Sequence, residues 1–268
     1  MIRKIIAIIK KDFLIETSYR LAFILNIFSI CTSLLIYYFI DKLFGSKLSP
    51  HLQEFGVNYF SYVLLGLAFF SYIGVGISSF SHKIRSEQMQ GTLESLLLTP
   101  TKTNILILSM GLWNLVFATF NVVIYFGLGV LLFKIDFSKI NILTSCLILI
   151  LSILSLSSLG IISAAFTIIF KRGNPIAWVI NTLEGLIAGV YFPITVMPAF
   201  LQFIARCFPI THAIRAMQLA VYQGYALSQL KKELLFLLIF SLILVPLSLK
   251  IFNAALNHAR KNGTLGQY

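Results

Sequence analysis

Long stretches without a charged residue constrain the fold of this chain most strongly. A helix needs about 20 apolar residues to cross the roughly 30 Å hydrocarbon core of a bilayer. Six stretches approach or exceed this length, and Glu184 is the one charged residue inside them. They cover residues 21–40, 57–80, 105–133, 142–170, 175–192 and 234–249. We therefore predict an all-α integral membrane protein with six transmembrane helices, which places both termini on the same side.

Apart from Glu184, the charged residues lie between these stretches. They make up 11% of the sequence, against about a quarter in an average soluble domain. This composition excludes an ordinary soluble enzyme and a disordered chain. The net charge of +12 does not indicate a nucleic-acid partner, because the charges are distributed over the connecting segments. The three cysteines, Cys31, Cys146 and Cys207, lack the spacing of a disulfide framework or a metal site, and we predict neither.

The connecting segments also indicate the orientation. Lys and Arg are more frequent in the segments on the side of the N-terminus, so the positive-inside rule places both termini in the cytoplasm. Within residues 1–20, Ile2, Ile5, Ile6, Ile9 and Phe13 share one helical face, and the basic side chains lie roughly opposite. We expect an amphipathic helix in the cytoplasmic interface. A plain positive anchor for the first span is the alternative interpretation.

Residues 193–230 are moderately apolar but are interrupted by proline. Pro198 and Pro209 divide the segment into pieces of about 10 and 15 residues, which are too short to cross a bilayer. Arg206, His212 and Arg215 lie within it. We expect external re-entrant or interfacial helices, with turns at Pro193, Pro198 and Pro209.

The cytoplasmic loop over residues 81–102 contains a short helical pattern. Thr92 is placed to cap the helix, Glu94 complements the helix dipole in the first turn, and Pro100 ends it. Leu93, Leu96 and Leu97 follow the i, i+3, i+4 spacing of one helical face. We expect this apolar stripe to need a groove on another protein or the membrane surface.

The same loop carries a family signature. The run Glu87-Gln88-x-x-Gly91-Thr92-Leu93-Glu94-x-Leu96-Leu97-x-Thr99-Pro100 resembles the signature of the type-2 family of ATP-binding-cassette (ABC) exporter permeases. The layout of the remaining chain is similar to that of the family, including the proline-rich segment between spans five and six. The resemblance implies that residues 1–268 form a single transmembrane domain of this family.

The resemblance further implies a coupling helix that docks on a separate cytoplasmic ATPase. The residues expected at that interface are Glu87, Gln88, Gly91, Thr92, Leu93, Glu94, Leu97 and Pro100. Lys171 and Arg172 form the other short cytoplasmic loop and either touch the same partner or serve as positive anchors only. A glycine at position 91 suits a helix start or a close backbone approach.

By the same resemblance the chain is a transport subunit and not an enzyme. It would form a homodimer with the translocation path between the copies, carry two ATPase subunits that bind ATP and Mg²⁺, and reside among lipids in the inner membrane of a prokaryotic cell. The cargo would be an amphipathic, drug-like, lipid or lipid-linked glycan molecule moved outward. The chain has no Gly-x-x-x-x-Gly-Lys loop of its own, so we expect ATP to be bound by another polypeptide.

Glu184 is the most distinctive residue outside the loop. A carboxylate near mid-membrane either lines a path or is neutral and hydrogen-bonded to a neighbouring span. Gly185 and Gly189 follow in Gly-x-x-x-Gly spacing, which indicates either a dimer interface or packing within one copy. The alternative function is a proton-coupled secondary transporter that uses Glu184. A membrane-embedded enzyme is disfavoured, because the sequence has no zinc-protease or nucleophile-elbow motif.

Overall fold

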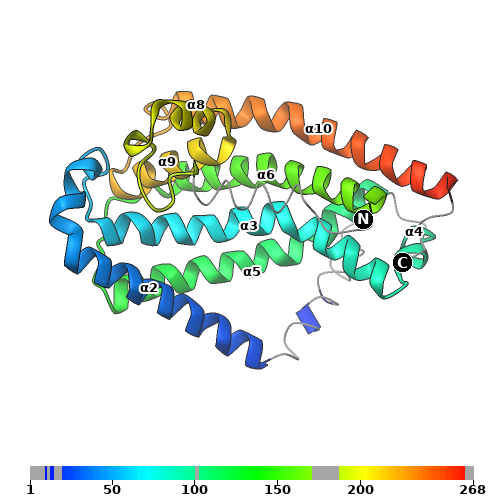
Figure 1. Cartoon of the computed structure of the whole chain (residues 1–268), viewed down its shortest axis with the longest axis horizontal. Coiled ribbons are helices and arrows are strands. Elements are labelled where there is room, and N and C mark those ends of the chain that lie inside the picture. The colour runs from blue at the N-terminus through cyan, green and yellow to red at the C-terminus, as the bar shows by residue number, and fades with distance from the viewer. Residues whose placement is uncertain (1–9, 11–12, 15–19, 100–102, 171–186, 263–268) are drawn as a thin grey trace.

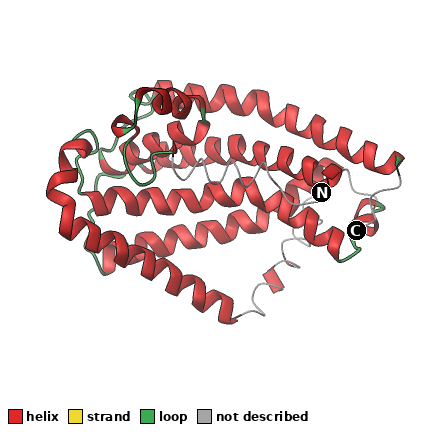
Figure 2. Cartoon of the chain, in the orientation of Figure 1, coloured by secondary structure: helices red, strands yellow, loops and turns green. Residues whose placement is uncertain are grey.

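The computed structural model describes residues 10, 13–14, 20–99, 103–170 and 187–262. Over these residues the regular structure is helical and contains no strand (Figure 2). The predicted all-α class is therefore confirmed for the described part of the chain. Only Lys10, Phe13, Leu14 and Arg20 of the predicted interface helix 1–20 are described, so that helix stays a prediction.

Five helices in the described residues are long and apolar enough to cross a membrane. They are α2 (Arg20–Leu48), α3 (Tyr59–Met89), α5 (Thr103–Leu131), α6 (Ile142–Phe170) and α10 (Lys231–Lys261). They coincide with five of the six predicted spans. Helices α3 and α10 continue well past their charge-free stretches, because a helix can extend into the polar region beyond the hydrocarbon core.

The predicted fifth span, 175–192, lies largely outside the described residues. Helical geometry is present at Ile187, but residues 188–192 form bends, so the prediction of a helix to Phe192 is wrong at that end. Gly189 has a φ of 79°, which favours glycine, and its carbonyl accepts a hydrogen bond from the hydroxyl of Tyr62 at 2.7 Å. Gly189 therefore belongs to a turn and not to a helical Gly-x-x-x-Gly face. Glu184 and Gly185 lie outside the described residues.

Helix α3 occupies the centre of the bundle. It packs against α5, α6, α2 and α9, while α10 packs on the other side of α6 (Figure 1). Its buried side chains, among them Tyr62, Leu65 and Ile77, supply much of the core. Helix α2 lies at the outside of the bundle and exposes large apolar side chains such as Leu21, Phe28 and Leu43. A movement of α3 would therefore displace the helices that pack against it, which are most of the bundle.

Small residues let α3 and α6 approach closely. A Cβ at Gly160 of α6 would collide with the carbonyl oxygen of Gly76 in α3, so the two backbones are in direct contact there. The buried hydroxyl of Ser152 donates to the Ile148 carbonyl of its own helix at 2.6 Å, and Ser155 bonds to Ser152 in the same way. Such serines are compact and satisfied, which allows close packing in a membrane.

Short helices lie at both ends of the bundle. Helix α4 (Leu93–Leu97) lies at one end. At the other end are η1 (Ser49–Leu52), η2 (Ile194–Val196), α8 (Ala199–Cys207) and α9 (Pro209–Tyr222) (Figure 1).

The three prolines singled out in the sequence each begin one of these short helices. Pro193 and Pro198 are the N-cap residues of η2 and α8, and Pro209 is the first residue of α9. Its fixed φ and missing N–H suit that position. Helix α9 is buried along nearly its whole length, whereas α8 exposes Phe200 and Phe203. Their re-entrant placement relative to a membrane stays a prediction.

Candidate coupling site

The turn after α3 is fixed by a glycine-dependent helix end. Gly91 has a φ of 68°. Its N–H donates to the Gln88 carbonyl at 3.0 Å, and the Thr92 N–H donates to the Glu87 carbonyl at 2.9 Å. This pair of bonds is a Schellman motif, which ends a helix and reverses the chain. No atom lies within 4 Å of a Cβ built at Gly91, so the backbone conformation and not a close approach requires glycine here.

Glu87 is buried beneath this turn and holds its two sides together. Its carboxylate accepts a hydrogen bond from the Thr92 hydroxyl, and its other oxygen lies 3.8 Å from Nζ of Lys83. Thr92 occupies the N-cap position of α4, but its side chain makes no capping bond. The predicted cap is therefore wrong, because the hydroxyl is engaged with Glu87. Gln88 is also buried, so Glu87 and Gln88 support the turn from below.

The leucine stripe of α4 faces the chain's own bundle. Leu93 is 2% exposed, and Leu96 and Leu97 are partly buried against the same apolar cluster. This cluster joins α3, α5, α6 and α10 through residues such as Ile107 and Phe252. The expectation that the stripe needs an external groove or the membrane surface is wrong for Leu93, since its contacts are supplied within this chain. The stripe anchors α4 instead.

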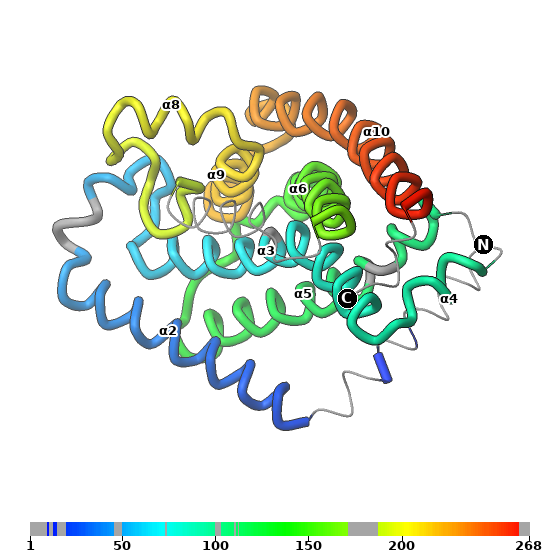
Figure 3. Tube along the Cα trace, turned by 45° about the vertical axis from the view of Figure 1, so that its right-hand side comes forward, coloured from blue at the N-terminus to red at the C-terminus, as the bar shows by residue number. Residues whose placement is uncertain are grey.

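The opposite face of this segment is exposed. Leu98 is 85% exposed and Met89 is 69% exposed. The exposed polar residues of the same surface are Gln90, Gly91, Thr92, Glu94, Ser95 and Thr99. We call these eight residues the coupling surface; it projects from the end of the bundle (Figure 3). The sequence pattern does not identify Met89 and Leu98 as part of this surface, because both residues fall outside the spacing of Leu93, Leu96 and Leu97.

The structure separates the predicted interface residues into two groups. Gly91, Thr92 and Glu94 lie on the coupling surface, whereas Glu87, Gln88 and Leu93 are buried beneath it and Leu97 is partly buried. Pro100, Lys171 and Arg172 lie outside the described residues. An apolar side chain beside a carboxylate on a short helix can contact a protein that presents apolar and basic residues.

Five bilayer-length helices with short helices at both ends define a multi-pass helical membrane protein. Residues 3–222 match the family model of the ABC-2 type transporter, and the chain belongs to this family. The matched region ends at the last residue of α9 and leaves out α10. A search of curated proteins found no match. The family assignment confirms the resemblance noted in the sequence and makes the chain a permease component rather than the catalytic ATPase.

Proposed function

We propose that this chain is the membrane subunit of an ATP-driven exporter and that its coupling surface docks on the ATPase. ABC-2 membrane proteins generally work with a cytoplasmic ABC ATPase, which supports the proposal. The observation that carries it is the division of α4 into a buried leucine face and an exposed face with Glu94 and Ser95. A helix of five residues is stable only when packed, and its packing leaves one side free for a partner.

The packing of α4 would transmit a movement of the ATPase to the helices of the bundle. Leu93 joins α4 to the cluster shared by α3, α5, α6 and α10, and the Glu87–Thr92 hydrogen bond joins its start to α3. A displacement of α4 by the ATPase would therefore move α3 with it. Because α3 contacts α2, α5, α6 and α9, the displacement would reach the far end of the bundle.

The proposed assembly contains two copies of the chain and two ATPase subunits, which bind the ATP and Mg²⁺. The exposed apolar side chains of α2, such as Ile24 and Phe28, suit contact with lipid or with a second copy. Helix α2 begins and α10 ends toward the side of the bundle that carries α4, which supports termini on the cytoplasmic side of an inner membrane (Figure 1). An amphipathic cargo, drug-like, lipid or lipid-linked glycan, would move outward between the copies.

The proton-coupled alternative depends on Glu184, which lies outside the described residues. No observation on the described residues favours it, and membership in the ABC-2 type transporter family favours ATP-driven transport. We therefore retain the exporter as the single proposed function.

Photo-crosslinking tests the docking surface. A photoreactive amino acid at Ser95, which is exposed on α4, is expected to crosslink the permease to its ATPase in native membranes. The matched control is Phe200 on α8, which is 65% exposed but lies at the opposite end of the bundle. The proposal predicts an ATPase adduct from position 95 only. An adduct from position 200 and none from position 95 would show that the ATPase does not dock on α4.

A further inference from the structure

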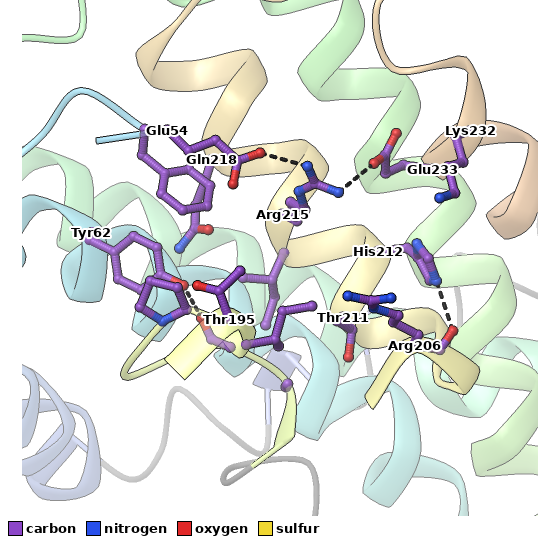
Figure 4. A pocket seen from close by; sticks show the side chains of 16 residues that line it. Glu54, Tyr62, Thr195, Arg206, Thr211, His212, Arg215, Gln218, Lys232 and Glu233 are labelled. Atoms are coloured by element: carbon purple, nitrogen blue, oxygen red, sulfur yellow. Dashed lines mark hydrogen bonds and ion pairs between the residues drawn. The ribbon is translucent and has the colours of Figure 1, made fainter. Parts of the chain in front are cut away.

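A polar cavity lies at the end of the bundle opposite α4. Its volume is about 240 Å³, and it lies between α9, the start of α10, the segment before α3 and the turn around Gly189 (Figure 4). The side chains around it include two acidic and three basic residues, which is unusual in a chain with few charges. The coupling mechanism proposed above does not use this cavity.

Arg215 is already neutralised by carboxylates. Its Nη1 donates to Oε1 of Glu233 at 3.1 Å, and its Nη2 donates to Oε1 of Glu54 (Figure 4). Burial by itself lowers the pKa of Arg215, but the hydrogen bond and charge of Glu54 and the charge of Glu233 outweigh it and raise that pKa. These ion pairs join α9 to α10 and to the segment before α3. Arg215 therefore serves to hold the cavity walls together.

Two other basic residues at the cavity have no acidic partner in the described part of the chain. Arg206 donates to the side chain of Gln202 at 3.3 Å, and Lys232 is exposed at the start of α10. The cavity lining carries a net charge of +1, because it contains two carboxylates against three Lys and Arg side chains. They are Glu54 and Glu233, and Arg206, Arg215 and Lys232. This balance favours an anion.

A buried side chain at the cavity has a polar atom without a hydrogen-bond partner among the described residues. Oγ1 of Thr211 is unpaired, although the residue is only 3% exposed, whereas the nearby Gln218 side chain hydrogen-bonds to Tyr62. A buried unpaired donor costs about 1–3 kcal/mol. Thr211 also lies in the first turn of α9, whose N-cap Phe208 makes no side-chain bond to the helix start. A helix N-terminus with free donors attracts negatively charged groups.

An apolar groove continues from the cavity along α10. It is about 420 Å³ in volume, and its apolar lining comes from Leu235, Phe236, Ile239, Phe240, Ile243 and Leu244. His212 and Lys232 line both the cavity and the groove. The His212 and Phe236 rings stack with their centres 4.2 Å apart at this junction. A polar site for an anion thus opens directly onto a surface for a hydrocarbon chain.

We propose that the cavity and the groove together bind one membrane lipid with an anionic phosphate headgroup. The phosphate is placed near Arg206 and Lys232, and it accepts a hydrogen bond from the Thr211 hydroxyl. One acyl chain lies in the groove on α10. The proposal goes beyond the exporter function, because it assigns a bound lipid to a site that the coupling route through α4 does not use. Phosphate chemistry accounts for the cations and the unpaired hydroxyl, and the groove accounts for the choice of a lipid over a free anion.

Native mass spectrometry of the purified protein, titrated with phosphatidylglycerol or phosphatidylcholine of identical chains, tests the site. We expect phosphatidylglycerol to bind about tenfold more tightly, and Arg206→Gln with Lys232→Gln to abolish that preference. Lys250→Gln, which alters an exposed cation further along α10 and outside both the cavity and the groove, should leave the preference intact. Equal binding of the two lipids, or an equal loss from Lys250→Gln, would overturn the proposal.

A second pair of variants tests the groove. Ile243→Trp is expected to fill the groove and weaken phosphatidylglycerol binding about tenfold, whereas Leu242→Trp, on the same exposed helix but outside the groove, should not. Inorganic phosphate is the probe for the headgroup alone. If millimolar phosphate displaces the lipid fully, or if the two tryptophan variants behave alike, the site takes a free anion and the lipid assignment is wrong. None of these measurements uses ATP, so they are independent of the exporter proposal.

Discussion

A permease that carries Glu94→Lys together with Leu98→Asp is expected to lose its ATPase partner and its ATP-driven transport. Both side chains lie on the coupling surface, and Leu98 is 85% exposed. Leu98→Asp would place a carboxylate in a desolvated apolar contact, and Glu94→Lys would reverse the charge beside it. We expect the two changes together to make the free energy of association less favourable by on the order of 3 kcal/mol. That corresponds to about a 100-fold weaker association. The measurement is the amount of ATPase that copurifies with the tagged permease at increasing salt.

The fold is expected to survive this change, because both replaced side chains are exposed and Leu93 still anchors α4. Phe200→Asp is the matched control, since it also places a carboxylate at an exposed apolar residue, but at the opposite end of the bundle. It should leave the ATPase bound. Retention of the ATPase by the double variant at the wild-type level would contradict docking on the coupling surface.

Replacing Gly160 by valine is expected to lower the free energy of unfolding by about 3 kcal/mol or more. The first carbon of the new side chain would collide with the carbonyl oxygen of Gly76. A backbone atom in a packed helix cannot move aside as a flexible side chain can, so α3 and α6 would have to separate. The gain in helix propensity is under about 1 kcal/mol and does not compensate. Unfolding in mixed micelles with increasing denaturing detergent measures the change.

Gly127→Val is the control for this prediction. Gly127 lies in α5, and no atom lies within 4 Å of a Cβ built there. This variant should therefore unfold at nearly the same detergent fraction as the wild type. Equal stability of the two valine variants would show that α3 and α6 do not cross at Gly76 and Gly160.

The spans could be predicted from sequence because a bilayer imposes a minimum length on every apolar helix. This criterion finds the positions of α2, α3, α5, α6 and α10 but not their ends. The ends depend on local chemistry, such as the positive φ at Gly91 that stops α3. At Gly189 the same conformational freedom produces a turn where hydropathy alone predicted continued helix.

The sequence predicts a short helix in the loop over residues 81–102, which the structure contains as α4, but it does not predict which face of α4 is exposed. The spacing of Leu93, Leu96 and Leu97 identifies an apolar face, yet spacing alone does not show whether that face packs within the chain or on a partner. The structure shows that the bundle itself covers it. The exposed side chains therefore include Leu98, which breaks the pattern.

The polar cavity proposed to bind a lipid could not be predicted, because its residues come from distant parts of the sequence. Glu54 lies in the turn before α3, Gln218 in α9 and Glu233 at the start of α10. No short sequence motif contains two of these residues. The available signal was the cluster of Arg206, His212 and Arg215 in a segment that is otherwise apolar. That cluster shows that charge is present, but only the fold shows that Arg215 is paired with acidic residues and that Arg206 has no acidic partner in the described part of the chain.

We propose that this chain works as a permease bound to a separate ATPase. The most direct measurement is the native mass of the tagged protein, purified from its own cell in mild detergent under conditions that preserve weak complexes. We expect a particle that contains two copies of the 30.1 kDa chain and two soluble ATPase chains. A particle that contains only this chain and lipid, obtained under the same conditions, would contradict it.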